Sequence, residues 1–165
     1  MKIDVLAFGA HPDDVELGCA GSLMVEMLDG KKTGIIDLTE GELGTRGSIE
    51  ERRKEAAEAS AILGISVREN LGLPDGFFQN DKESQLLVIR AIRKYQPEII
   101  LCNALSDRHP DHGKAGRLVA DAAFLSGLSK IETSDGAEKQ TAWRPKYVFH
   151  YTQDRYLQPD FVVDV

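Results

Sequence analysis

The chain has 165 residues, of which 42% are hydrophobic and 28% charged, and its formal net charge is −7. This composition is typical of one globular domain with its own core, and the acidic balance without a Lys/Arg cluster excludes nucleic acid and anionic membrane surfaces as main partners. The N-terminus lacks the pattern of a signal peptide and no stretch approaches the ~20 apolar residues of a membrane span, so we expect a cytoplasmic location.

The first half of the chain alternates β-prone apolar runs with helical patterns. Gly30 is placed to end the first helix, and Ser48 with Glu51 forms the capping-box pattern that begins the second. In chain order we predict a strand at 3–8, a helix at 14–29, a strand at 33–38, a glycine-rich loop at 39–48 and a helix at 49–63.

The second half continues the same alternation. In chain order we predict a strand at 67–71, a helix near 83–95, a strand at 98–103, a helix at 111–128, and late strands at 146–151 and 160–165. The polar stretch 129–145 is predicted to be a surface loop, with a role as a lid left open. This order indicates an α/β, Rossmann-like fold. It is one domain over 1–165, whose mainly parallel sheet has helices on both faces.

Three polar clusters follow predicted strands, at the edge of the sheet where open α/β proteins bind ligands. They are His11-Pro12-Asp13-Asp14, Thr39-Glu40-Gly41-Glu42 and the run from Asp107 to His112. Neutral imidazole and carboxylate are zinc ligands, and a catalytic site with three of them keeps one position for water. Further carboxylates and histidines in the clusters are candidates for a general base and a general acid.

Other chemistries fit the sequence less well. Cys19 and Cys102 have no paired spacing, so we expect two buried, reduced thiols and no cysteine ligands. The loop at 39–48 lacks the Lys-Ser/Thr of a phosphate-binding loop, and its Glu40 and Glu42 would repel phosphate. Each His-Pro-Asp segment alone also fits a simple turn with an aspartate cap. Both together, each following a buried strand, favour a metal site.

The motifs resemble those of a known family. AHPDD at 10–14, TEGELGTRGS followed by Arg52-x-x-Glu55, and RHPDHGKA at 108–115 are similar to the LmbE-like (PIG-L) zinc N-acetylglucosamine deacetylases, and the resemblance extends over essentially the whole chain. DVLAFGAHPDDVELG, LGLPDG, DRHPDHG and PDFVVDV resemble in particular the bacillithiol-pathway subgroup, which deacetylates N-acetylglucosaminyl malate. Family members continue beyond the PDFVVDV segment, so the resemblance implies a deacetylase domain at 1–165 that lacks the family's C-terminal segment.

The resemblance implies a metal site and a catalytic base. Zn²⁺ would be held by His11, Asp14 and His112, although the same ligand set also suits Fe²⁺ in the cell. Asp13 would be the general base that takes a proton from the attacking water. The reaction implied is hydrolytic removal of the N-acetyl group from an N-acetylglucosamine conjugate, a small-molecule substrate.

The remaining site residues follow from the same resemblance and from charge. His109 would stabilise the oxyanion or protonate the leaving amine, and Asp111 would orient a histidine. We expect His109 to be charged near neutral pH, because the Asp111 carboxylate favours imidazolium. Arg52 would contact substrate, and Arg108 is a candidate to bind the malate carboxylates, since arginine suits bidentate carboxylate recognition.

Some alternatives stay open at the level of sequence. The conjugate could instead be an inositol conjugate, a mycothiol S-conjugate or a chitin fragment. A non-catalytic module that binds a sugar or nucleotide on the same fold is a further alternative. Relatives tend to be homo-oligomers, so the resemblance also implies self-association.

Overall fold

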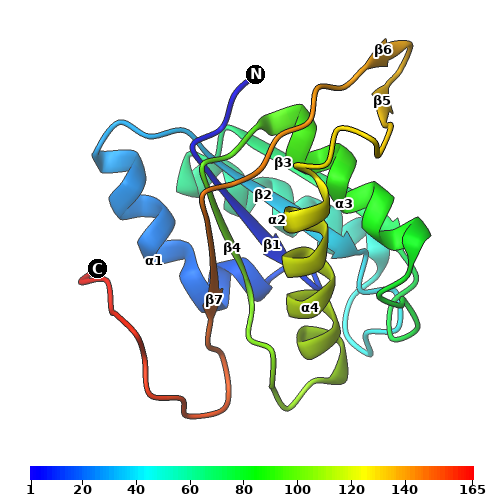
Figure 1. The fold of residues 1–165 in the computed structure, drawn as a ribbon. Helices are drawn as coiled ribbons and strands as arrows, with labels where there is room; N and C mark the ends of the chain where they lie inside the picture. The colour runs from blue at the N-terminus through cyan, green and yellow to red at the C-terminus, as the bar shows by residue number, and fades with distance from the viewer.

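A five-stranded sheet forms the centre of the protein, whose residues 1–165 are all described by a computed structural model (Figure 1). Its strands lie in the order β3-β2-β1-β4-β7, and every neighbouring pair is parallel. The strands are β1 Val5–Gly9, β2 Thr33–Thr39, β3 Val67–Leu73, β4 Ile99–Asn103 and β7 Tyr147–Tyr151. The chain runs outward from β1 to β3 and then returns to place β4 on the other side of β1. The strand order therefore reverses between β1 and β4, which is where such folds bind ligands.

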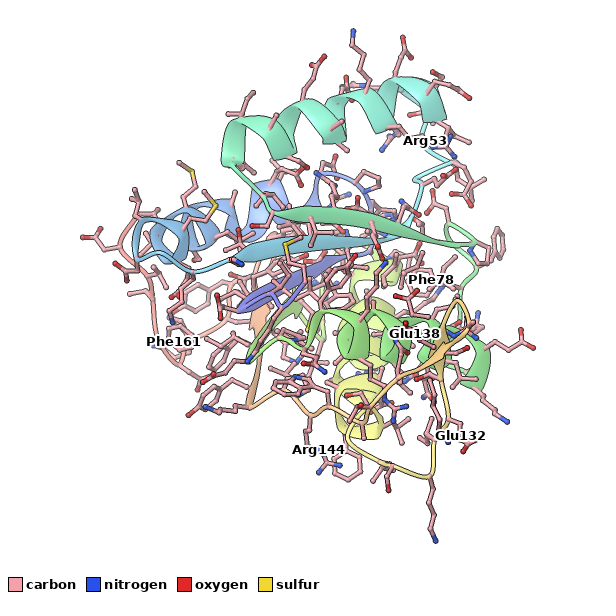
Figure 2. All side chains as sticks on the ribbon, turned by 90° about the horizontal axis from the view of Figure 1, so that it is seen from above. Arg53, Phe78, Glu132, Glu138, Arg144 and Phe161 are labelled. Carbon is pink, nitrogen blue, oxygen red and sulfur yellow. The ribbon has the colours of Figure 1, made fainter.

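Helices cover both faces of the sheet, which confirms the predicted α/β, Rossmann-like class. Figure 2 shows α2 on one side of the sheet, and α3 and α4 on the other. The α1 helix packs beside α2 and against β1, β2 and β4. The helices are α1 Asp14–Leu28, α2 Ile49–Leu63, α3 Lys82–Tyr95 and α4 Pro110–Leu125. None of these helices is both long and apolar enough to cross a membrane.

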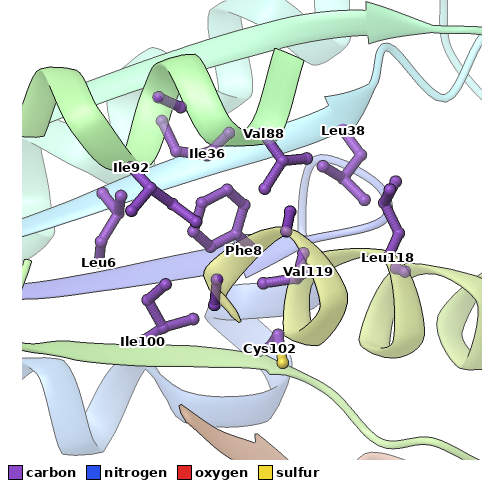
Figure 3. Packing of buried hydrophobic residues seen from close by; sticks show 14 of the residues in the cluster. Leu6, Phe8, Ile36, Leu38, Val88, Ile92, Ile100, Cys102, Leu118 and Val119 are labelled. Carbon is purple, nitrogen blue, oxygen red and sulfur yellow. The ribbon is translucent and has the colours of Figure 1, made fainter. Parts of the chain in front are cut away.

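The main core lies between the sheet and the α3/α4 layer. It is a cluster of 20 buried residues, and Figure 3 shows the Phe8 ring of β1 with Ile92 of α3 and Val119 of α4 around it. Side chains alternate along a strand, so the neighbouring Ala7 points to the opposite face. There it joins a smaller cluster of 7 buried residues with Val15 and Cys19 of α1. Both cysteines are buried and free, as predicted.

Local capping signals locate the helices accurately. The α2 helix begins and ends at the predicted residues, because Ser48 and Glu51 form both bonds of a capping box and Gly64 takes the left-handed conformation at φ 68°. No residue of α2 is buried, so its apolar packing against the sheet is limited. Its boundaries are therefore set by caps that the sequence itself displays.

One prediction about the C-terminal third was wrong, and another was incomplete. The segment 160–165 is not a strand: it does not pair with the free edge of β7, and the chain turns back toward α1, where Val165 lies against Gly21 and the Phe161 ring packs on Phe149. The stretch 129–145 is not entirely irregular, since β5 Ser134–Asp135 and β6 Glu138–Lys139 form a short antiparallel hairpin. Neither outcome can be read from the local sequence, because strand pairing depends on which segments the folded chain brings side by side.

Candidate metal centre

The two His-Pro-Asp segments meet at the carboxyl ends of β1 and β4. His11 follows β1, and His109 and His112 lie at the start of α4, after β4. One ring nitrogen from each of the three histidines lies within 4.8 Å of the others, although the two segments are far apart in sequence. The predicted convergence is therefore present, and it lies at the point where the strand order reverses.

The carboxylate of Asp14 lies between two of these imidazoles. Its Oδ1 is 3.1 Å from His112 Nε2, and its Oδ2 is 3.6 Å from His11 Nδ1. The side-chain amides of Asn103 and Gln153 donate to the same carboxylate, and so does the backbone N–H of His11. Burial opposes the charge, but hydrogen bonds from His11 and His112 and the charge of His112 hold the pKa of Asp14 well below its ordinary value. Asp14 is therefore ionised and fixed in place.

A second carboxylate lies at the outer nitrogen of each of these histidines. Asp75 Oδ1 is 3.0 Å from His11 Nε2, and Asp107 Oδ1 is 3.1 Å from His112 Nδ1, although the latter pair is not aligned for a good hydrogen bond. These contacts direct the remaining nitrogens, His11 Nδ1 and His112 Nε2, toward Asp14. Histidines that bind metals are commonly oriented in this way.

Sequence reasoning did not assign Asp75 or Asp107 to the site. Asp107 stands two residues before His109, at the start of the polar run 107–112. Asp75 belongs to the LPDG turn after β3, and its position in a motif of the resembled subgroup was the available signal. Its contact with His11 spans 64 residues of sequence, so only the folded chain reveals it.

The donor set of His11, Asp14 and His112 fits a divalent transition metal. Two imidazole nitrogens and one carboxylate are the ligands that Zn²⁺ and Fe²⁺ accept, and they leave positions for water. A second group within 4.8 Å combines His11 with Asp75 and Asp111. The carboxylate oxygens of that group already accept bonds from backbone N–H groups and from Lys114, so they suit a supporting role better than a second ion site.

Asp13 has an unusual backbone for a non-glycine residue, with φ 127° and ψ −20°. It occupies the N-cap position of α1, but its side chain makes no capping bond and instead lines a cleft of about 390 Å³ with Arg52 and Glu16. Strain of this kind is retained where the surrounding structure enforces it, often at functional sites. Burial and the neighbouring Asp14 raise the pKa of Asp13, and Arg52 opposes that shift only in part. A carboxylate in this position is poised to accept a proton.

His109 differs from the charged histidine that we expected. Burial lowers its pKa below the ordinary value of 6.5, and the neighbouring His11 and His112 lower it further. Its Nδ1 accepts the backbone N–H of Asp111 at 3.3 Å, so the neutral ring carries its proton on Nε2. The expectation is corrected because the Asp111 carboxylate opposes the shift too weakly to reverse it.

The Asp111 carboxylate points away from His109 toward the turn after β3. It is fully buried, and its two oxygens accept bonds from Gly76 N at 2.7 Å and Lys114 Nζ at 3.1 Å. Its Oδ2 also lies 3.5 Å from His11 Nε2. The histidine nearest to this carboxylate is therefore His11, and the backbone of Asp111 rather than its side chain contacts His109.

The two predicted arginines occupy different surroundings. Arg52 packs its guanidinium against Gly41 and Gly44 and lines the same cleft as Asp13. The Arg108 side chain is 78% exposed and pairs with Asp154 at 3.5 Å. Arg52 is thus part of the cleft, whereas Arg108 lies on the surface beside the histidines.

Comparison with known proteins gives consistent matches. The family model PIG-L, described as GlcNAc-PI de-N-acetylase, matches residues 6–123. The chain is similar to the uncharacterized deacetylase YaiS of Escherichia coli K12, at 34% identity over 93% of this chain and 84% of that protein. It is also similar to diacetylchitobiose deacetylase of Thermococcus kodakarensis, at 28% identity over 98% of this chain and 63% of that protein. The solved structure of the conserved protein TT1542 from Thermus thermophilus matches with a TM-score of 0.88 and 42% identity, over 96% of this chain and 70% of that chain.

One similar protein is named for a different reaction. The 4-oxalmesaconate hydratase of Pseudomonas putida is 27% identical over 97% of this chain and 66% of that protein. The chain spans 63% of the length of the diacetylchitobiose deacetylase and 66% of that of the hydratase. The similar proteins thus include both deacetylases and a hydratase by name.

Proposed function

Because the chain belongs to the PIG-L family, we propose that it is a metal-dependent hydrolase that removes the N-acetyl group from an N-acetylglucosamine conjugate. The observation that carries the proposal is the contact of Asp14 with both His11 and His112, beside a strained Asp13. His11, Asp14 and His112 offer ligands to a metal, and Asp13 offers a base at the wall of a cleft.

In the proposed mechanism, His11, Asp14 and His112 hold the metal, and their orientation comes from Asp75 and Asp107. A divalent ion bound there would supply a Lewis acid that acidifies water and polarises the amide carbonyl. With the metal bound, Asp75 and Asp107 would favour a proton on the outer nitrogen of each imidazole and so leave the nitrogen beside Asp14 free to bind the ion. The protein's own contribution at this step is therefore a rigid, correctly protonated ligand set.

Asp13 takes the proton from the attacking water. Its raised pKa increases its affinity for that proton at neutral pH, and its fixed backbone keeps the carboxylate at the edge of the cleft. The same carboxyl group then returns the proton to the amine nitrogen as the carbon–nitrogen bond breaks. Acetate and the free amine are the products.

His109 donates a hydrogen bond where negative charge develops. Its neutral ring carries a proton on Nε2, and its centroid lies 5.0 Å from that of His112 and 4.8 Å from that of His11. A donor in this position can stabilise the oxyanion of the tetrahedral intermediate without carrying a full charge itself. Between the two roles expected for His109, we therefore propose the oxyanion role.

For the substrate we propose N-acetylglucosaminyl malate, as in bacillithiol biosynthesis. The support is the sequence resemblance of the HPDD, LPDG and HPDH segments, together with Arg52 in the cleft and Arg108 next to His109 in sequence. Diacetylchitobiose is the competing substrate, since a similar protein is named for it. A cytoplasmic location and a homo-oligomeric assembly form part of the same proposal.

The proposal is tested by metal analysis and by acetate release. Purified protein should contain close to one zinc or iron per chain and should release acetate from N-acetylglucosaminyl malate faster than from diacetylchitobiose or a mycothiol S-conjugate. Faster release from another conjugate would transfer the assignment to that substrate. Protein that binds no metal and releases no acetate from any N-acetyl sugar would refute the proposed function.

Hydration of an unsaturated carboxylic acid is the second candidate, because the chain resembles a hydratase of that type. The same base and metal ligands could activate water for addition to a carbon–carbon double bond. Loss of the ultraviolet absorption of 4-oxalmesaconate, without any acetate formed from N-acetyl sugars, would favour this reaction. Acetate release with no change in that absorption would favour deacetylation.

A further inference from the structure

The turn Pro74–Gly76 after β3 connects the candidate metal centre to the glycine-rich loop at 40–48. Asp75 at its centre is 7% exposed. One oxygen of its carboxylate contacts His11 Nε2 at 3.0 Å, and the other accepts the backbone N–H of Leu43 at 3.0 Å. A single side chain thus joins a candidate metal ligand to a loop.

Two hydrogen bonds attach the loop to this turn, one accepted and one donated by Asp75. The backbone N–H of Asp75 donates to Glu42 Oε1 at 2.8 Å, in addition to the bond that Leu43 makes to the Asp75 carboxylate. Residues 42–48 are otherwise exposed. Arg46 and Gly47 of this loop line the cleft that contains Asp13. Arg52 also donates to Arg46 O, so the two contacts with Asp75 are part of what positions this wall of the cleft.

The turn itself is held by α4. Gly76 N donates to Asp111 Oδ2 at 2.7 Å, and Gly76 O accepts from Lys114 Nζ at 2.9 Å. Gly76 has φ 73°, a conformation that favours glycine, and this brings both of its backbone groups to α4. Because the turn is anchored to α4, a shift of the Asp75 carboxylate alters its contacts with His11 and Leu43 instead of moving the whole turn.

We propose that Asp75 is a positioning residue that couples metal binding at His11 to the order of the 40–48 loop. The inference rests on the metal site of the proposed function. A metal on His11 Nδ1 would fix the remaining ring proton on Nε2, where it donates to Asp75 Oδ1. Asp75 is then held where its second oxygen accepts Leu43 N–H. By thermodynamic reciprocity, an ordered loop increases metal affinity by the same factor.

The Asp75→Asn variant tests this geometry directly. Asparagine has one acceptor oxygen, so it can accept from His11 or from Leu43 but not from both, and its NH₂ group would face the other donor. Glu42→Ala is a second variant that removes only the acceptor of Asp75 N–H on an exposed residue. Asp121→Asn is the matched control, since Asp121 is exposed and bonds only Asn80.

Two measurements use zinc alone as the probe: zinc affinity by chelator competition, and hydrogen exchange of peptides covering 40–48 with and without zinc. In the wild type, zinc should slow exchange in the loop. In Asp75→Asn, zinc affinity should fall by roughly 10- to 100-fold and the zinc-dependent protection should disappear. Glu42→Ala should lose part of the protection with a smaller loss of affinity. Asp121→Asn should behave as wild type.

The possible failures are distinguishable. If the wild type binds no zinc, the proposed metal site and this inference are both overturned. If the wild type binds zinc and Asp75→Asn binds it equally well, the inference is overturned while the metal site stands. Loop exchange that does not respond to zinc in the wild type would also overturn the coupling. Thermal unfolding of each variant confirms that the comparison is made on folded protein.

Discussion

Asp13 and Asp14 are adjacent in sequence, yet the pKa values of their carboxyl groups are shifted in opposite directions. Asp14 is surrounded by hydrogen-bond donors, and its pKa is held low. Asp13 lines the cleft without a capping bond, and burial beside Asp14 raises its pKa. Pairs of carboxyl groups whose environments separate their pKa values commonly divide the work of a site, one fixed as an anion and the other exchanging protons.

This division predicts different outcomes for two similar substitutions. Asp13→Asn should retain metal and lose about 10²- to 10⁴-fold in kcat, because it removes only the general base. Asp14→Asn should lose metal, because a neutral amide is a poor ligand and the carboxylate charge between His11 and His112 is removed. Metal content and kcat measured on both variants check the prediction. If Asp13→Asn loses the metal and Asp14→Asn keeps it, the two roles are exchanged.

At the scale of elements, Arg93 fixes the connection that follows α4. Its side chain is on α3 and almost fully buried, and no carboxylate neutralises it. The guanidinium donates instead to one threonine hydroxyl and three backbone carbonyls of the connection, namely Thr133 Oγ1, Ser126 O, Leu128 O and Ile131 O. The polar stretch that the sequence marks as a loop therefore has a defined path across the ends of α3 and α4.

Truncating this side chain should destabilise the fold without affecting chemistry. Arg93→Met leaves four acceptors without their donor, which should reduce the free energy of unfolding by about 3 kcal/mol. Arg90→Ala, on the exposed side of the same helix, should change it by no more than about 0.5 kcal/mol. Urea unfolding of both variants gives the comparison. An equal effect of the two substitutions would mean that the network around Arg93 contributes little.

The elements also show which local signals predict structure. The bounds of α2 are predictable because Ser48, Glu51 and Gly64 act on residues within one turn of themselves. The apolar pattern of 160–165 looks equally like a strand, yet the segment does not pair with the free edge of β7, and the chain instead returns toward α1. Hydrophobic pattern alone therefore does not decide whether a terminal segment joins the sheet.

At the scale of the whole molecule, the strand order creates the site. β1 and β4 are neighbours, with Ala7 paired to Leu101, so the segments that follow them emerge side by side. Asn103 at the end of β4 reinforces this, since its side chain accepts from Ala10 N and donates to Asp14. Asp14, Asp75 and Asp111 surround His11 and raise its pKa to about 9 against the effect of burial. The site is thus an anionic pocket suited to a cation.

Metal removal should therefore affect both stability and turnover. Zinc at about 100 times its Kd should add about 2.7 kcal/mol to the free energy of unfolding, which for a domain of this size raises Tm by roughly 5–10 °C. A chelator should abolish that increase together with acetate release, and added zinc or iron(II) should restore both. Thermal scans and activity assays on the same samples check this. An unchanged Tm and full turnover after verified removal of metal would contradict a metal site in the fold.

The sequence by itself determined the order of elements, the α/β class and the residues able to bind a metal, because periodicity, caps and ligand chemistry are properties of short segments. Only the tertiary structure decided what surrounds those residues. The contacts of Asp75 and Asp107 with the histidines, the neutral state of His109 and the exposed position of Arg108 all depend on segments that are distant in sequence. Burial and charge at a site are sums over everything packed around it, and that packing exists only in the folded chain.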